Sequence, residues 1–521
     1  MNKIHVLDCT LRDGGYCNQW EFGLNNIDKV IRGLVKANID VIECGYISKK
    51  KEHDINSTQY TTFEDANSHI PVNKMDKLFV AMINYGEYEI NQIPPKMEKG
   101  IDGIRVAFHK KNVQEAVDFC RKIGDKGYKV FVQPMVSISY SDEEFIELIK
   151  YINSIKPYAF YIVDSFGMMK KKDLIRLFYM VEHNLDKDVW IGFHSHNNMQ
   201  LAYSNAQCLV DMRTSRNLLI DASIYGMGRG AGNLNTELFV DYLNECTQGN
   251  YSIRPLLHII DEILNEFYIK NSWGYSLSKY LSASYNIHPS YATYYEEKNT
   301  LTVEAMDELF SKMNSKKKYL FDKSYAEELY LDYMASKQKQ NLNEEILKNV
   351  VEGKRILLIA PGKSAEKEKN KIFQFLLQDK VLPISINFAF EEATLIFVSN
   401  MIRFRDLDKK YYKKCIVTSN IQADNVFCKV EYDDLLAPIE NVCDNAGLMA
   451  IKLMIDMKAE EIILAGFDGY SYYSEDNYSA EQRVLITKPA LAEEMNQNIA
   501  RVLKQYSKKA KIRFLTESLY S

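Results

Sequence analysis

The chain has 521 residues, of which 46% are hydrophobic and 26% are charged. This length allows two or three domains with sizeable cores, because one domain usually takes about 150 residues. The formal net charge is −5 and residues of both signs are interspersed, which excludes a general nucleic-acid or membrane-surface binder as the first expectation.

Compartment is indicated by two further features of the sequence. The amino terminus, MNKIHVLDCT, lacks the apolar core of a signal peptide, and no run of about 18 apolar residues predicts a membrane span. The 9 cysteines show no regular spacing and no CxxC pair. We therefore expect reduced thiols and a cytoplasmic protein.

Apolar strand-like runs recur along the first half of the chain, at residues 3–8, 40–45, 77–83, 102–108, 128–134, 158–164, 189–196 and 218–224. Helical stretches lie between most of them, for example at 25–38, 111–127 and 141–155. Eight strands that alternate with helices predict an α/β fold, a (β/α)8 TIM barrel over residues 1–250. A doubly wound open sheet is the alternative, since periodicity does not show closure.

Polar residues follow the predicted strands at their carboxyl ends, where the chemistry of such barrels takes place. In chain order these are Arg12 and Asp13, Glu43, Asn84, Arg105 and His109, Gln133, Asp164, and finally His194 and His196. The eighth run continues into the glycine-rich stretch YGMGRGAGN at 225–233. This distribution predicts a site at the carboxyl face of the barrel.

His194 and His196 are two residues apart on a predicted strand, so their side chains lie on the same face. With Asp13 from another strand end they form a set that suits a divalent cation. Two hydrogen-bonded histidines near a surface turn are the alternative. Imidazole and oxygen ligands favour Mn²⁺ or Mg²⁺ over Zn²⁺, because thiolate ligands are missing. We expect the cation to polarise a carbonyl group and to stabilise the enolate formed from it.

Five ordered segments carry a family resemblance: DCTLRDGGY (8–16), GIRVAFH (103–109), VDSFGMM (163–169), GFHSHNNMQLA (192–202) and IDASIYGMGRGAGN (220–233). They resemble the metal-dependent pyruvate aldolases of the 4-hydroxy-2-oxovalerate aldolase type. The wider barrel superfamily also holds 3-hydroxy-3-methylglutaryl-CoA lyase and isopropylmalate synthase. The resemblance covers residues 1–300 and implies a lyase that joins or separates pyruvate and an aldehyde.

The resemblance also implies roles for individual residues. Asp13, His194 and His196 would hold the cation, and Asn233 would be a further ligand or support one. Arg12 would bind the enolate oxygen of a pyruvate unit. From the residues themselves, Arg12 can instead form a salt bridge with Glu43, and Glu43 can orient Arg12 or transfer protons. Arg105, Asp164 and Ser165 are candidates for substrate contacts, and the last two are equally candidates for structural roles.

The general base is a point of departure from the family, because Tyr16 stands where the aldolases carry a histidine. Tyrosine titrates near pH 10, so it accepts a proton at neutral pH only when strongly perturbed. Tyr16, His109, Glu43 and a metal-bound hydroxide are the candidates for the base. A barrel that binds or docks without turnover is therefore the alternative function.

The stretch GMGRGAGN has several interpretations. It lacks the cysteine of the CoA lyases and the GERAGN form of the acyl-CoA synthases, which favours an aldolase over a Claisen-type synthase or lyase. Its glycines fit a dinucleotide fingerprint, but that fingerprint belongs after a first strand and not after an eighth. A nest of backbone amides that binds an anion is the remaining interpretation.

Residues 251–345 predict a helical extension followed by a charged linker. In the aldolases such a segment covers the site and supports dimer contacts, so the resemblance implies a homodimer. A tyrosine of that segment can reach the substrate, and Tyr275 and Tyr280 are the matching candidates, with core packing as the alternative.

Residues 353–521 alternate strands and helices again, which predicts a Rossmann-like open sheet. The stretch PGKS at 361–364 is not a Walker A motif, because Leu357 stands where its first glycine is required. The Pro361–Gly362 turn before a helix predicts backbone amides that could hold a phosphate. The domain is similar to nucleotide- or sugar-handling domains of surface-polysaccharide enzymes, so we expect it to bind a nucleotide, a phosphorylated carrier or the acceptor. A structural or docking domain is the alternative.

Overall fold

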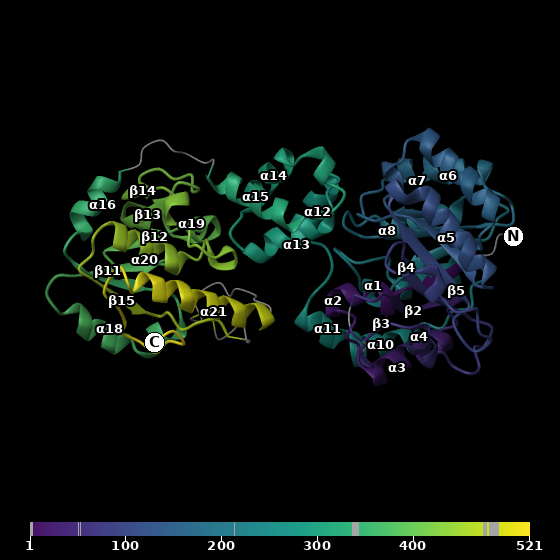
Figure 1. Cartoon of the computed structure of the whole chain (residues 1–521), viewed down its shortest axis with the longest axis horizontal. Coiled ribbons are helices and arrows are strands. Elements are labelled where there is room, and N and C mark those ends of the chain that lie inside the picture. Colours follow the sequence, from purple (N-terminus) through teal and green to yellow (C-terminus); the bar gives the residue numbers. More distant parts are fainter. Residues whose placement is uncertain are drawn as a thin grey trace. The chain divides into compact units, whose positions relative to one another are not determined.

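The eight strands expected in the first half of the chain are all present and close into a parallel barrel. Figure 1 labels β2, β4 and β5 among them. The order of the eight strands is β1-β9-β8-β7-β6-β5-β4-β2, and β1 pairs with β2 to complete the ring. Their bounds are β1 (Ile4–Asp8), β2 (Val41–Ile47), β4 (Leu78–Asn84), β5 (Gly103–Phe108), β6 (Lys129–Pro134), β7 (Ala159–Asp164), β8 (Trp190–Ser195) and β9 (Leu218–Ala222). A short strand, β3 (Gln59–Tyr60), pairs with β2 outside the ring. The predicted closed barrel is confirmed.

The computed structural model describes residues 4–50, 52, 54–212, 214–335, 343–471, 477–478 and 489–521. The chain divides into two compact units, Met1–Ala292 and Thr293–Ser521. The predicted helical extension spans this division, and residues 336–342 of the predicted linker lie outside the described residues.

The helices of the first unit connect the barrel strands and continue beyond the last one. They are α1 (Thr10–Asp13), α2 (Gly15–Asn18), α3 (Leu24–Lys36), α4 (Phe63–Ser68), α5 (Val113–Asp125), α6 (Asp142–Ile155), α7 (Lys171–Asn184), α8 (Ala202–Asp211), α9 (Thr236–Cys246), α10 (Arg254–Ile259), α11 (Asn265–Lys270) and α12 (Leu277–Ser284). Helix α6 begins where the sequence predicts it, because Ser141 and Glu144 form a reciprocal capping box. Helix α13 (Pro289–Lys298) crosses the division between the units.

The interior of the barrel follows from the two-residue periodicity of its strands. Its apolar side chains form one buried cluster, Leu7, Cys9, Val41, Val80, Phe131, Ala159, Tyr161, Val163 and Leu219. Three of these strands carry a polar residue two positions further along, on the same face. Glu43 follows Val41, Gln133 follows Phe131, and Asp221 follows Leu219. A polar layer therefore covers an apolar floor, and it does so at the carboxyl ends of the strands.

The second unit contains a parallel sheet of seven strands in the order β14-β13-β12-β11-β10-β15-β16. The bounds are β10 (Arg355–Ile359), β11 (Val381–Ile386), β12 (Leu395–Val398), β13 (Cys415–Thr418), β14 (Cys428–Val430), β15 (Glu461–Ala465) and β16 (Ile512–Phe514). Its helices are α14 (Val303–Lys312), α15 (Lys323–Ala335), α16 (Glu344–Val351), α17 (Lys363–Lys367), α18 (Lys369–Leu376), α19 (Met401–Asp406), α20 (Ala446–Asp456) and α21 (Pro489–Tyr506). The chain winds outward from β10 on one side and resumes with β15 on the other, so the predicted open α/β sheet is confirmed.

Strand β11 is not apparent from the local sequence. The segment VLPISI contains Pro383, and proline lacks a backbone donor, which argues against a central strand. In the structure Pro383 pairs in register with Leu357 of β10, and its carbonyl oxygen accepts a hydrogen bond from the amide of Thr394. Burial of the surrounding apolar residues outweighs the missing donor here.

The structure also bears on the cysteines and on the possibility of a membrane span. All cysteines of the chain are free thiols. Among the described residues, no helix combines the length and the apolar character that crossing a bilayer requires.

Candidate metal centre

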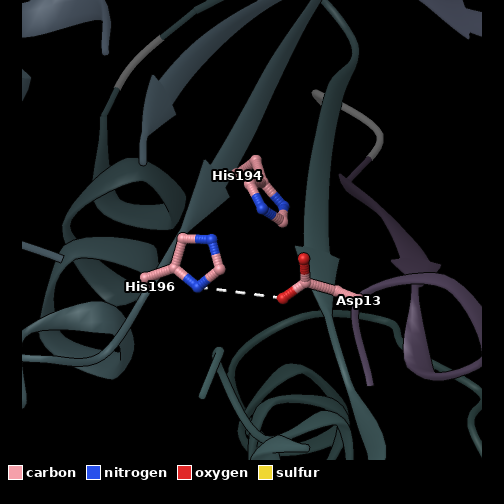
Figure 2. Close-up of side chains that lie close together, drawn as sticks. All are labelled: Asp13, His194 and His196. Carbon is pink, nitrogen blue, oxygen red and sulfur yellow. Dashed lines mark ion pairs between the residues drawn. The ribbon is translucent and has the colours of Figure 1, made fainter. Parts of the chain in front are cut away.

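Asp13, His194 and His196 come together at the carboxyl face of the barrel (Figure 2). Asp13 ends α1, the single helical turn that follows β1, whereas His194 lies on β8 and His196 directly after it. One ligand atom from each residue lies within 4.8 Å of the others, and all three side chains are buried. Figure 2 shows His196 facing the Asp13 carboxylate, with Nδ1 3.8 Å from Oδ2.

The ionisation states of these residues are those that bind a cation. Burial raises the pKa of Asp13, but Arg12, His196 and His194 outweigh it and hold that pKa well below its ordinary value. Burial lowers the pKa of His196 to about 3, against the opposing effect of Asp13. At neutral pH the group therefore offers a carboxylate and a neutral imidazole, which are metal ligands.

Two buried polar atoms next to this group have no hydrogen-bond partner among the described residues, His196 Nδ1 and Asn233 Oδ1. Buried polar atoms nearly always have partners, so both atoms fit coordination to a cation. The Asn233 amide nitrogen donates to Asp13 Oδ2 at 2.6 Å. Asn233 thus supports Asp13, and its oxygen has no other partner among the described residues. The residues present fit a divalent cation with nitrogen and oxygen ligands.

Arg12 is held beside this group by two carboxylates. Its Nε donates to Glu43 Oε2 at 2.9 Å, and its Nη1 pairs with Asp13 Oδ1. Its Nη2 is buried and has no hydrogen-bond partner among the described residues. Arg12 therefore presents an unused donor next to the candidate cation, where it can bind an oxygen that gains negative charge.

From Arg12, a row of ion pairs between side chains of alternating charge extends through the barrel interior. Glu43 Oε2 also accepts from Arg105 Nη1 at 2.6 Å, and Arg105 Nη2 pairs with Asp221. Asp221 Oδ2 in turn lies 2.9 Å from His194 Nδ1. Since Glu43 is shared by two guanidinium groups, its geometry supports the orienting role. Arg105 has no exposed surface, so it contacts protein groups and not the space above the site.

Asp221 is a residue of this centre that the sequence analysis missed. It occupies the inward position two residues after Leu219, within an otherwise apolar strand. An aspartate at such a position is the signal that could have found it, because a buried carboxylate needs a partner. Its contact with His194 Nδ1 leaves Nε2 of that ring for the cation.

The remaining predicted residues lie around the metal group or away from it. The Asp164 carboxylate accepts hydrogen bonds from the amides of Met168 and Met169, both at 3.0 Å. The Ser165 hydroxyl accepts a hydrogen bond from the amide of Val136. Both side chains thus hold loops at the face of the barrel. Three of the predicted residues are accessible. Tyr16 and His109 are exposed at the surface. Tyr275 lines a pocket together with Tyr225, Tyr268 and Trp273.

The glycine-rich loop at 226–233 packs directly against the metal group. A Cβ atom on Gly228 would lie 2.1 Å from Asn233 Nδ2 and 2.6 Å from Asp13 Oδ2, so only glycine fits there. The amide of Ala231 donates to Asn198 Oδ1 at 2.8 Å. This amide is therefore already bonded within the chain, and α9 begins only at Thr236. An anion nest in this loop stays a prediction.

In the second unit, a carboxylate of the chain itself occupies the turn expected to hold a phosphate. The Ser364 amide donates to Asp468 Oδ2 at 2.7 Å, and the Ser364 hydroxyl also bonds to Asp468. The amide of Gly362 donates to the carbonyl oxygen of Gly466. Binding of a nucleotide or phosphorylated carrier by this unit stays a prediction.

Comparison with known proteins places the similarity in the barrel. The HMGL-like family model matches residues 3–249. A 4-hydroxy-2-oxovalerate aldolase from Shewanella halifaxensis (strain HAW-EB4) is 28% identical over 243 residues, which cover 46% of this chain and 70% of that protein.

Two solved structures match part of the chain. The N-terminal domain of a Bacteroides vulgatus protein has a TM-score of 0.49 and 29% identity, with 56% of this chain and 96% of that chain covered. The carboxyl transferase domain of Rhizobium etli pyruvate carboxylase has a TM-score of 0.50 and 13% identity, with 68% and 65% covered.

Proposed function

Residues 3–249 form an HMGL-like domain, and on this premise we propose that the barrel is a divalent-metal-dependent aldolase. It forms or cleaves the carbon–carbon bond between a pyruvate enolate and an aldehyde, as the name of the relative from Shewanella halifaxensis suggests. The observation that carries the proposal is the buried group of Asp13, His194 and His196 next to the unused Nη2 of Arg12.

Asp13, His194 and His196 would hold Mn²⁺ or Mg²⁺, and the Asn233 oxygen would complete the set. The cation, when bound, supplies Lewis acidity toward the carbonyl oxygen of pyruvate.

Within the chain, Nη2 of Arg12 would donate a hydrogen bond to the enolate oxygen of the pyruvate unit, where negative charge is greatest. A single donor of this kind contributes about 10²–10³ to kcat. Glu43 fixes the plane of the Arg12 guanidinium through Nε.

A coupled assay tests this function. With Mn²⁺ present, 4-hydroxy-2-oxopentanoate should yield pyruvate, which lactate dehydrogenase reports as oxidation of NADH. EDTA should abolish turnover and added Mn²⁺ should restore it. His194→Ala should lower kcat/KM at least about 10²-fold, since a ligand is lost. His183→Ala, which removes an exposed imidazole from α7, should leave it unchanged.

Tyr16 supports a second candidate, a barrel that binds pyruvate without turnover, because it stands in the position of the family's general base. Wild-type protein that binds Mn²⁺ but releases no pyruvate from any 4-hydroxy-2-oxoacid would favour this candidate. Turnover that depends on acyl-CoA would instead favour a Claisen-type reaction. The homodimer stays a prediction.

A further inference from the structure

Arg229 lies in the glycine-rich loop between β9 and α9. Its amide donates to Asp13 Oδ2 at 3.4 Å, so its backbone lies beside the metal group. Its side chain extends to Ser165, whose carbonyl oxygen accepts from Nη2 at 2.9 Å, and its Cζ lies 5.5 Å from the ring centre of Tyr16. Since Tyr16 is 46% exposed, the guanidinium lies at the mouth of the site.

The guanidinium of Arg229 differs from the other two at this site in its charge balance. Arg12 and Arg105 are each paired with two carboxylates. Arg229 bonds to a neutral carbonyl oxygen, its Nε is buried without a hydrogen-bond partner, and no carboxylate of the described part of the chain forms an ion pair with it. Asp13 lies near enough for its charge to interact with Arg229 but does not pair with it directly. The unused Nε donor of this guanidinium therefore suits an anionic ligand.

Arg229 and Lys111 supply positive charge near this opening, whereas His109 and His288 have lowered pKa values and are neutral at pH 7. His109 and His288 both lie near enough to Arg229 for its charge to lower their pKa, in addition to the larger effect of burial. Lys111 acts on His109 in the same way. The ring of His288 packs edge-on against Phe166, next to Ser165. The positive field at this opening would attract an anionic ligand.

We propose that Arg229 binds a carboxylate or phosphate of the acceptor aldehyde and so selects acceptors that carry a negative charge. This inference rests on the proposed aldolase function and adds the substrate class to it. Pyruvate has its own partners deeper in the site, because the unused donor of Arg12 belongs to a side chain that is only 7% exposed. A guanidinium suits the anion better than an ammonium does, since it can donate two parallel hydrogen bonds to either group.

The test compares neutral and charged acceptors in aldol addition with the full-length, Mn²⁺-loaded protein. Glyceraldehyde is paired with glyceraldehyde 3-phosphate, and propanal with succinic semialdehyde, so the two pairs distinguish phosphate from carboxylate. Wild-type protein should prefer the charged member of at least one pair about tenfold or more in kcat/KM. Arg229→Gln should lower kcat/KM for that member about 10- to 100-fold and leave its neutral partner nearly unchanged.

Two further variants control for charge and folding. Arg229→Lys keeps the charge without the two parallel donors, so it should retain part of the preference. Arg32→Gln removes a 74% exposed guanidinium from α3 and should change neither acceptor.

A second readout separates failure of this inference from failure of the proposed function. Exchange of the pyruvate methyl protons with D₂O needs Mn²⁺ and the enzyme but no acceptor. Absence of this exchange in wild-type protein contradicts the aldolase function itself. If exchange occurs and Arg229→Gln raises its KM for pyruvate, Arg229 binds pyruvate and the inference is wrong. Equal losses with neutral and charged acceptors, or no preference in wild-type protein, also overturn it.

Discussion

Asp221 links the candidate metal centre to the charges beneath it. It accepts from His194 Nδ1 and pairs with Arg105, which in turn contacts Glu43. The contact with His194 fixes both the ring orientation and the tautomer, because a proton on Nδ1 leaves the lone pair on Nε2. Asp221 is therefore a positioning residue, with an effect on metal affinity that is separable from the ligands themselves.

Asp221→Asn should weaken Mn²⁺ binding about 10- to 100-fold, because the carboxamide oxygen can still accept from His194 but the negative charge behind this ligand is lost. Titration of Mn²⁺ by calorimetry measures this effect directly. The matched control is Asp40→Asn, since Asp40 pairs with His5 at 3.3 Å at the opposite end of the barrel. An equal loss of affinity in both variants would show a general effect on folding and contradict the positioning role.

Several residues of the site could be predicted because each carries a local signal. His194 and His196 share a strand face by spacing, and Asp13 follows the first strand directly. Asp221 carries only the signal of a carboxylate within an apolar strand, which does not name its partner, and Arg229 carries no local signal. Their importance depends on partners far away in the sequence, Ser165 and His194, and only the closed barrel brings these pairs together.

At the scale of elements, the sheet of the second unit is tied together at the amino ends of three strands. Glu461 of β15 accepts from Arg355 of β10 and from Arg513 of β16, both at 3.0 Å, and lies 2.9 Å from Lys511. Arg355 and Glu461 are also register partners. Burial would raise the pKa of Glu461, but these three cations lower it to about 2.

Glu461→Gln should lower the free energy of unfolding of the second unit by about 1.5–3 kcal/mol at pH 7, because hydrogen bonds to a charged group are lost. The folded pKa lies below the unfolded value, so the contribution is complete above pH 4.5 and declines as pH falls toward 2. Urea unfolding at pH 7 and pH 3 measures it. A difference between variant and wild type that does not shrink at pH 3 would show that charge is not the cause.

The strands themselves were predictable to different degrees for a physical reason. Each barrel strand is an apolar run bounded by polar or glycine-containing turns, so all eight were predicted to within a few residues. In β11 the position of Pro383 is compatible with the sheet only because neighbouring strands supply the packing, which the local sequence does not reveal.

At the scale of the whole molecule, all residues of the proposed active site lie in the first of the two compact units. Every proposed metal ligand, Arg12 and Arg229 lie within Met1–Ala292, and the family match ends at residue 249. The second unit has its own sheet and its own buried clusters, such as the one around Leu357 and Ile463. A ligand of the barrel should therefore stabilise one unit without the other.

Mn²⁺ should raise only one of two thermal transitions in a calorimetric scan of the whole chain. At 100 times its Kd, a ligand that binds only the folded state adds about 2.7 kcal/mol, which shifts the midpoint of a unit of this size by roughly 5 °C. His194→Ala should abolish that shift, whereas Glu461→Gln should lower the midpoint of the other transition and leave the Mn²⁺ effect intact. A single transition, or a rise of both midpoints with Mn²⁺, would contradict independent units, because binding energy confined to the barrel cannot stabilise a unit that unfolds separately.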